Sequence, residues 1–436
     1  MKMNLTTLAV LGIVLLLVLM FLGMNIGLSM LLVGFIGYGL AVNWKAAIGV
    51  FQTVPYVQAA SYSMTVVPLF IMMGNFAFAS GMSENLYSAA YKWMGRLSGG
   101  LACATVAACA AFGAICGSTN ATTATMGIVS IPQMRKYGYS DKLSCGAVAV
   151  GGGLGVMIPP SSCFIVYGII SEQSIGRLFA AGILPGIMLA ILIIIMIVLQ
   201  VKRNPSLAPT GESYSIKEKF ASLVKCWDVI ILFVGTFYVM FSGIFTINEA
   251  AAAGCLLSLI IFIAKGKFTV KSFAKVMWDS VKTTSMTYLI VIGAMVFGSF
   301  LSITQLPMKL ASTIDGWDVS KYLILVVIIL VYLVLGCFMD ALPMVMLTVP
   351  IFLPIVTGLG FDPIWFGVII IVVMMMGFIT PPVGMNCYVL SGIVRDVPLS
   401  TIFAGSVPYL LALFIGALLL IAFPQIALVI PNALYG

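Results

Sequence analysis

The chain has 436 residues, of which 62% are hydrophobic and 8% are charged, and its mean hydropathy is +1.19. This composition excludes an ordinary soluble globular protein and predicts a polytopic membrane protein. The formal net charge is +8, but the basic residues lie between apolar segments, so we attribute the charge to membrane topology and expect no nucleic-acid partner.

Several classes of chemistry are excluded by missing residue types. The chain contains no histidine, which removes His-based zinc sites, Ser/His triads and His proton relays. It contains no GxxxxGK[ST] motif, so we expect no ATP hydrolysis by this chain. The nine cysteines show no CxxC spacing and lie mostly in apolar stretches, which is typical of small buried side chains. We therefore predict that the protein is not an enzyme.

Apolar runs close to the ~20 residues that a membrane helix needs recur along the whole chain. They cover residues 5–22, 26–42, 62–80, 179–201, 226–245, 248–264, 283–303, 322–338 and 400–423. The first run lacks a small-residue cleavage pattern, so we expect it to be retained as a helix. The runs predict an all-α protein with about ten transmembrane helices.

An internal repeat divides the chain. The stretches that begin at Pro132 and Pro354 align without a gap. The residues that recur 222 positions later are Pro132, Gly138, Gly155, Pro159 and Pro160. We predict two halves, about 1–205 and 206–436.

Matching connections of the two halves carry different charge. Residues 132–142 hold three basic residues and 354–364 none, whereas 265–282 hold five lysines and 43–60 one. Suppose that each half crosses the membrane five times and adds one re-entrant segment. Then 16 of the 21 basic residues are cytoplasmic, and both termini lie outside. The halves are then inverted relative to each other, as in many secondary transporters.

The long connections 43–60 and 265–282 are candidates for arm helices along the membrane surface. The second mixes aromatic residues with five lysines, as an interfacial amphipathic helix does. The alternative is an ordinary basic loop.

Each half also contains a polar stretch inside an apolar region. Residues 113–127, GAICGSTNATTATMG, would break a membrane helix and expose carbonyls, hydroxyls and an amide. We predict a re-entrant hairpin over about 100–132 with its tip at Gly117–Asn120, and a second one over about 322–356. The alternative is a pair of complete spans packed through small residues.

Asp340 is the one acid predicted to lie deep in an apolar environment. An intramembrane carboxylate is costly unless it is paired or binds a cation, so Asp340 is a candidate functional residue. The alternative is a structural, hydrogen-bonded or protonated side chain. The remaining acids, Asp228 among them, fall at predicted helix ends and are expected to face water.

Pro-Pro pairs interrupt predicted helices at about 143–172 and 364–395. Two prolines remove two amide donors and leave carbonyls one turn earlier without partners. Such carbonyls, with nearby hydroxyls, suit a small cation such as Na⁺, and the following half-helix N-terminus suits an anion. The residues that supply these groups are Gly155, Pro159, Pro160, Ser161 and Ser162 in the first half, and Gly377, Thr380, Pro381, Pro382, Gly384 and Asn386 in the second.

These segments resemble a known family. GSTNATTATMG followed by GGGLGVMIPPSS, and GCFMDALPMVMLTVPIFLPI followed by GFITPPVGMNCYVLSGI, look like the large membrane subunit of tripartite ATP-independent periplasmic (TRAP) transporters, over essentially the whole chain. The resemblance implies the fold of the ion-transporter superfamily, in which a transport domain moves as an elevator against a scaffold. It also implies residence in the bacterial cytoplasmic (inner) membrane, in contact with lipid.

The resemblance further implies Na⁺-driven uptake of organic anions, with two or more Na⁺ ions and no organic cofactor. The implied partners are a small four-helix membrane subunit, expected here as a separate polypeptide, and a periplasmic substrate-binding protein. Members of the family carry C4-dicarboxylates, sialic acids, other sugar acids, keto acids or sulfonates. No arginine lies near either predicted tip, so we expect recognition by Ser, Thr and Asn side chains and helix N-termini.

Residue by residue, the resemblance implies two Na⁺ sites. The predicted ligands are Cys116, Ser118, Asn120, Gly155, Ile158 and Pro160 at one site, and Gly336, Asp340, Gly377, Thr380 and Gly384 at the other. The predicted substrate-binding residues are Ser118, Asn120, Thr122, Ser161, Ser162, Thr380 and Asn386.

Three other functions remain open at the level of sequence. They are an ion channel that uses the polar hairpins as a filter, a Na⁺/anion carrier that works without a binding protein, and a membrane enzyme with Asp340 as acid or base. The inverted repeat disfavours a channel, and the lack of a histidine, a nucleophile motif or a second nearby acid disfavours an enzyme.

Overall fold

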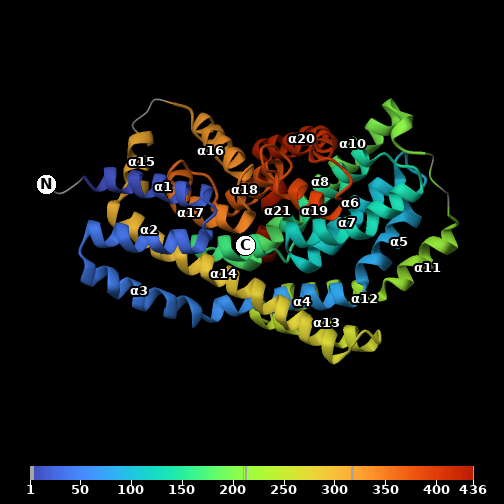
Figure 1. Cartoon of the computed structure of the whole chain (residues 1–436), viewed down its shortest axis with the longest axis horizontal. Helices are drawn as coiled ribbons and strands as arrows, with labels where there is room; N and C mark the ends of the chain where they lie inside the picture. Colours follow the sequence, from blue (N-terminus) through green and yellow to red (C-terminus); the bar gives the residue numbers. More distant parts are fainter. Residues whose placement is uncertain (1–3, 210, 212–213, 316–318, 436) are drawn as a thin grey trace.

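The computed structural model describes residues 4–209, 211, 214–315 and 319–435. Within these ranges all regular secondary structure is helical. Figure 1 shows that helices from both ends of the chain mix in space, with α1, α2 and α3 beside α14 at one end and α6, α7 and α8 near α19 and α20 towards the other.

The helices of the first half follow one another with short connections. They are α1 (Leu5–Phe21), α2 (Ile26–Ala41), α3 (Trp44–Ala59), the 3₁₀ turn η1 (Tyr62–Thr65), α4 (Val66–Ala79), α5 (Met82–Met94), α6 (Gly100–Cys116), α7 (Thr119–Lys136), α8 (Asp141–Met157), α9 (Ser162–Ser171), α10 (Ile175–Arg203) and η2 (Pro205–Leu207).

The second half repeats much of this order. Its helices are α11 (Ile216–Lys225), α12 (Trp227–Phe241), α13 (Ile247–Ala264), α14 (Val270–Thr304), α15 (Leu306–Asp315), α16 (Lys321–Gly336), α17 (Ala341–Gly358), α18 (Pro363–Gly377), α19 (Met385–Ile393), α20 (Leu399–Ala422) and α21 (Gln425–Tyr435). At the offset of 222 positions, α1 and α2 correspond to α12 and α13, and α6 to α9 correspond to α16 to α19.

Corresponding helices make corresponding contacts across the two halves. Helix α2 packs against α14, and its counterpart α13 packs against α4. Helix α7 packs against α19, and its counterpart α17 packs against α9. The two halves are therefore intertwined, because each packs helices against the other.

Fewer helices than the ten predicted are long and apolar enough to cross a membrane. Six helices in the described ranges are long and apolar enough to span a membrane, or eight if two bent pairs each count as one span. Several other apolar helices, α1, α2, α6, α16 and α18 among them, have only 15–17 residues. The described residues thus form a multi-pass helical membrane protein.

The two predicted arms differ from each other. The range 43–60 coincides with α3, which is followed by an extended residue, Ser61, and by η1. The range 265–282 covers a turn and the first part of α14, which continues without a break for 35 residues. No proline or glycine lies between Val270 and Leu289, so nothing there ends the helix.

Asp228 is buried, contrary to the expectation that it faces water. Its Oδ2 lies 2.6 Å from Nζ of Lys265, and its side chain is 1% exposed. Lys265 follows the last residue of α13, which packs beside α12, and so reaches the first turn of that helix. The burial is possible because the lysine compensates the charge.

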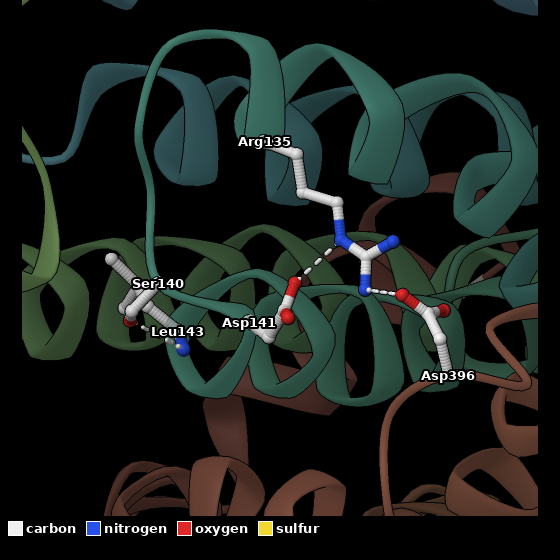
Figure 2. A network of polar contacts seen from close by, with 5 residues as sticks. All are labelled: Arg135, Ser140, Asp141, Leu143 and Asp396. Carbon is white, nitrogen blue, oxygen red and sulfur yellow. Dashed lines mark hydrogen bonds and ion pairs between the residues drawn. The ribbon is translucent and has the colours of Figure 1, made fainter.

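A second ionic network joins the halves at the C-terminal end of α7. Arg135 Nε lies 2.6 Å from Asp141 Oδ1 at the start of α8, and Arg135 Nη2 lies 2.8 Å from Asp396 Oδ2 in the turn after α19 (Figure 2). Ser140 caps α8 by accepting a hydrogen bond from Leu143 N. The hydrogen bond from Arg135 lowers the pKa of Asp396 below its ordinary value.

We expect Arg135→Gln to decrease the apparent melting temperature of the purified protein at neutral pH by a small amount, because these side chains are partly exposed. A carboxylate with a lowered pKa stabilises the fold above its ordinary pKa of 3.8, and the contribution is lost as the pH falls through the folded-state value. The difference in melting temperature between wild type and variant should therefore become smaller at acidic pH. A difference that stays constant between neutral and acidic pH would show that Asp396 is not the linked group.

Candidate functional site

Both polar stretches form tight turns between two helices. In the first, Gly117 has a φ of +60°, and Ser118 caps α7 by accepting a hydrogen bond from Ala121 N at 3.4 Å. In the second, Asp340 caps α17 through Ala341 N, which donates to its Oδ1 at 2.8 Å. A positive φ is costly for residues with a Cβ, which explains the glycine in the first turn. Short polar side chains cap the helix that follows.

Each turn is bonded to the Pro-Pro break of its own half. The carbonyl of Gly117 accepts hydrogen bonds from Ser162 N at 3.2 Å and Ser162 Oγ at 2.8 Å. The carbonyl of Cys337 accepts from Val383 N at 3.2 Å and Gly384 N at 3.1 Å. Turn and break therefore hold each other in place in both halves.

Glycine pairs allow the turns to approach the broken helices closely. A Cβ on Gly113 of α6 would lie 2.5 Å from the Cα of Gly155 on α8. A Cβ on Gly377 of α18 would lie 2.6 Å from the Cα of Gly336 on α16. Only glycine allows this backbone-to-backbone packing.

The two turns meet each other. Asn120 Nδ2 donates to Asp340 Oδ2 at 3.0 Å, across 220 positions of sequence. The Oδ1 of Asn120 is buried and has no hydrogen-bond partner. None of the three ion pairs among the described residues includes Asp340. This carboxylate is therefore held by neutral donors alone.

A cavity of about 610 Å³ lies at the meeting point, between the two turns, the α1–α2 connection, α4 and α14. Four of the predicted site residues line it: Cys116, Ser118, Asn120 and Asp340. Asp340 is the one carboxylate among its lining residues, and no lysine or arginine lines it.

Three lining polar residues were not predicted from the sequence. They are Asn75 on α4 and Thr283 and Thr287 on α14. Asn75 Nδ2 donates to Ser280 Oγ of α14 at 2.8 Å, so this wall of the cavity is itself linked by a hydrogen bond. A single amide in the apolar run 62–80 was the available signal for Asn75.

The remaining predicted side chains lie behind the cavity wall. The hydroxyls of Thr122, Ser161, Ser162 and Thr380 donate to the carbonyls of Ser118, Val156, Gly117 and Met376, respectively. The structure thus uses these hydroxyls to bond the backbone around the turns and breaks.

Asn386 is also placed away from the cavity. It is fully buried, accepts a hydrogen bond from Thr119 Oγ1 at 2.7 Å and donates to the carbonyl of Ala149 at 2.8 Å. Because both ends of its amide are bonded to protein, Asn386 joins α19 to α7 and α8.

Oxygen atoms converge at Gly155. A Cβ on this glycine would lie 2.6 Å from Thr122 Oγ1 and 2.8 Å from the carbonyl oxygen of Ser118. No cluster of three or more His, Cys, Asp or Glu residues occurs in the described part of the chain. Carbonyl and hydroxyl oxygens are ligands that hard cations prefer and transition metals do not. Ile158, Pro160 and Gly384 lie at the breaks beside these turns.

Solved transporters share this architecture. The fold is similar to that of the YdaH transporter of Alcanivorax borkumensis, with a TM-score of 0.66, 14% identity and coverage of 98% of this chain and 100% of that one. It is also similar to MtrF of Neisseria gonorrhoeae, with a TM-score of 0.55, 14% identity and coverage of 97% and 95%. The apolar helices and these likenesses define the fold of a multi-pass helical membrane protein.

The family follows from the sequence comparisons. The family model "Tripartite ATP-independent periplasmic transporter, DctM component" matches residues 13–426. The chain is 34% identical to the C4-dicarboxylate TRAP transporter large permease protein DctM of Pseudomonas aeruginosa, over 88% of this chain and 89% of that protein. It is 32% identical to the sialic acid TRAP transporter large permease protein SiaM of Vibrio cholerae, over 86% and 88%.

A third relative is the isethionate TRAP transporter permease protein DctMQ of Oleidesulfovibrio alaskensis. It is 35% identical over 76% of this chain and 52% of that protein. The chain belongs to the TRAP transporter large permease family and is a multi-pass protein of the bacterial inner membrane.

We expect Gly377→Ala to decrease the stability of the purified protein by about 1–3 kcal/mol, because the added methyl group meets backbone that has no room to move. Gly358→Ala on α17 is the matched control, since a Cβ there meets no atom within 4 Å. Thermal unfolding in detergent measures both. Equal effects of the two substitutions would contradict the close packing of α16 on α18.

Proposed function

We propose that the protein is the membrane permease of a Na⁺-coupled transporter that imports a small organic anion delivered by a periplasmic binding protein. The observation that carries this proposal is the junction of the two turns at the cavity, where Asp340 has no cationic partner. A half-buried intramembrane carboxylate without a cationic partner favours a bound cation.

Na⁺ is the coupling ion that the available ligands fit best. At the first turn we propose the carbonyl of Ser118, the side chain of Asn120 and the backbone from Gly155 to Pro160. At the second we propose Asp340 with the backbone near Gly336, Gly377 and Thr380. Support comes from the oxygens that face Gly155 and from the unpartnered Oδ1 of Asn120.

The transported substrate is proposed to be a carboxylate or sulfonate. Three relatives are named for C4-dicarboxylate, sialic acid and isethionate, all of which are organic anions. The cavity offers amides and hydroxyls but no basic side chain, and its wall contains Asp340. An anion would therefore be repelled unless a cation first offsets this charge. Obligatory coupling to Na⁺ follows from that requirement.

An elevator movement is proposed for transport. The turns and broken helices would form the moving domain, and α1, α2, α4, α12, α13 and α14 the scaffold. Support comes from the position of the cavity between the turns and these scaffold helices. The α1–α2 connection lies in its wall, and an outside N-terminus places that connection on the cytoplasmic side. The cavity would then face the cytoplasm in this conformation.

Membership of the family implies two partners: a small membrane subunit and a periplasmic substrate-binding protein. We propose that the binding protein loads the cavity when the moving domain faces outward. No observation of comparable weight favours channel activity.

We expect Asp340→Asn to decrease Na⁺ affinity by roughly 10- to 100-fold, since the substitution removes the charge while keeping the shape. Uptake of radiolabelled succinate, sialic acid or isethionate would be measured in proteoliposomes that contain the chain and the small subunit, with the binding protein outside. The Na⁺ concentration that gives half-maximal uptake should be higher in the variant than in wild type. The control is Asp279→Asn, which removes an exposed acid on α14.

Two outcomes would contradict the coupled mechanism. One is wild-type uptake that persists without a Na⁺ gradient. The other is uptake that persists without any binding protein, which would instead favour an independent carrier.

A further inference from the structure

The first helix of the second half, α11, presents an apolar row to its surroundings. Ile216, Phe220 and Val224 are 74%, 58% and 71% exposed and lie four residues apart, on one helix face. The following helix α12 turns away from α11 by 63°. In Figure 1, α11 lies at the edge of the molecule beside α5 and α12. This geometry is typical of a helix that lies in the membrane surface.

A second apolar feature lies directly behind this helix. A groove of about 550 Å³ runs between α5, α11 and α12, lined by Leu86, Ala90, Met94, Leu223 and Val229 among others. Trp93 forms part of its wall, donates from Nε1 to the carbonyl of Lys219 at 3.1 Å and packs edge-on against Phe220 at 5.7 Å between ring centroids. The groove is therefore continuous with the apolar row of α11.

Two of the helices that form this groove also carry basic residues. The basic residues on α5 and α11 and just after α5 are Lys92, Arg96, Lys217, Lys219 and Lys225. The Nζ of Lys219 lies 6.0 Å from the Trp93 ring centroid. The acid between these lysines, Glu218, is held in the helix cap, where Ser215 N and Oγ donate to it at 2.8 and 2.7 Å. Both bonds are to Oε2 of Glu218, so this acid is tied to the N-terminal end of α11.

From these three features we propose that α5, α11 and α12 bind an anionic phospholipid of the cytoplasmic leaflet. An acyl chain fills the groove, and Lys219 and Lys225 contact the phosphate. A phospholipid provides both the hydrocarbon that the groove and the apolar row need and the negative charge that the lysines need. The charge pattern of the sequence places residues 202–225 on the cytoplasmic side, where anionic lipids attract basic segments.

The test uses the full chain purified in detergent and titrated with phosphatidylglycerol or phosphatidylethanolamine, with retained lipid counted by native mass spectrometry. Wild type should retain phosphatidylglycerol preferentially. In the variant Lys219→Gln/Lys225→Gln, the preference for phosphatidylglycerol over phosphatidylethanolamine should decrease about fivefold for each lysine removed. This corresponds to about 1 kcal/mol for each lysine. Ala90→Trp should decrease retention of both lipids because it fills the groove.

The matched control is Lys271→Gln/Lys275→Gln, which removes two exposed lysines on α14, also from a predicted cytoplasmic segment. An equal loss in this control would show general surface attraction and overturn the proposal. Equal retention of the two lipids by wild type would overturn it as well. A third contrary result is loss of bound phosphatidylglycerol when the small subunit is added, because the groove would then be a protein contact. Far-UV circular dichroism checks that each variant is folded.

Discussion

The structure depends on one constraint, which is that backbone groups freed inside a membrane must find partners within the protein. Each Pro-Pro pair interrupts a helix, and each polar turn ends one. Both sets of backbone groups find partners in each other. The carbonyls of Gly117 and Cys337 in the turns accept hydrogen bonds from the amides and the hydroxyl that follow the breaks. A buried group left without its partner would cost about 1–3 kcal/mol. Turn and break must therefore occur as a pair, and each half contains one pair.

This pairing also explains why the polar site is built from small residues. The helices that lead into the turns approach the broken helices most closely where glycine faces glycine, at Gly113 against Gly155 and at Gly336 against Gly377. Close backbone approach brings carbonyl oxygens together that a larger side chain would separate. The glycines thus determine the positions of the oxygen atoms proposed to bind Na⁺, although they contribute no side chain to them.

The positions of the helix breaks and of the polar turns could be predicted from the sequence. Proline removes amide donors and short polar residues cap helices, so the Pro-Pro pairs indicate the breaks and the polar stretches indicate the turns. Contacts between residues distant in sequence could not be predicted in this way. The bond from Asn120 to Asp340, the burial of Asp228 beside Lys265 and the inward position of Asn386 all depend on packing across more than 30 positions. Hydroxyl-rich sequence likewise does not show which hydroxyls bond backbone and which face a cavity.

The bond between Asn120 and Asp340 has a further consequence within the proposed function. Asn120 donates a hydrogen bond from its amide nitrogen to the carboxylate, and its Oδ1 is buried without a hydrogen-bond partner. A cation that attracts this oxygen would fix the amide in the orientation that also serves Asp340. Ion binding at one turn would then stabilise the arrangement needed at the other, and the coupling would be reciprocal. Two Na⁺ ions that bind through one shared amide would bind cooperatively, without any change of fold between their sites.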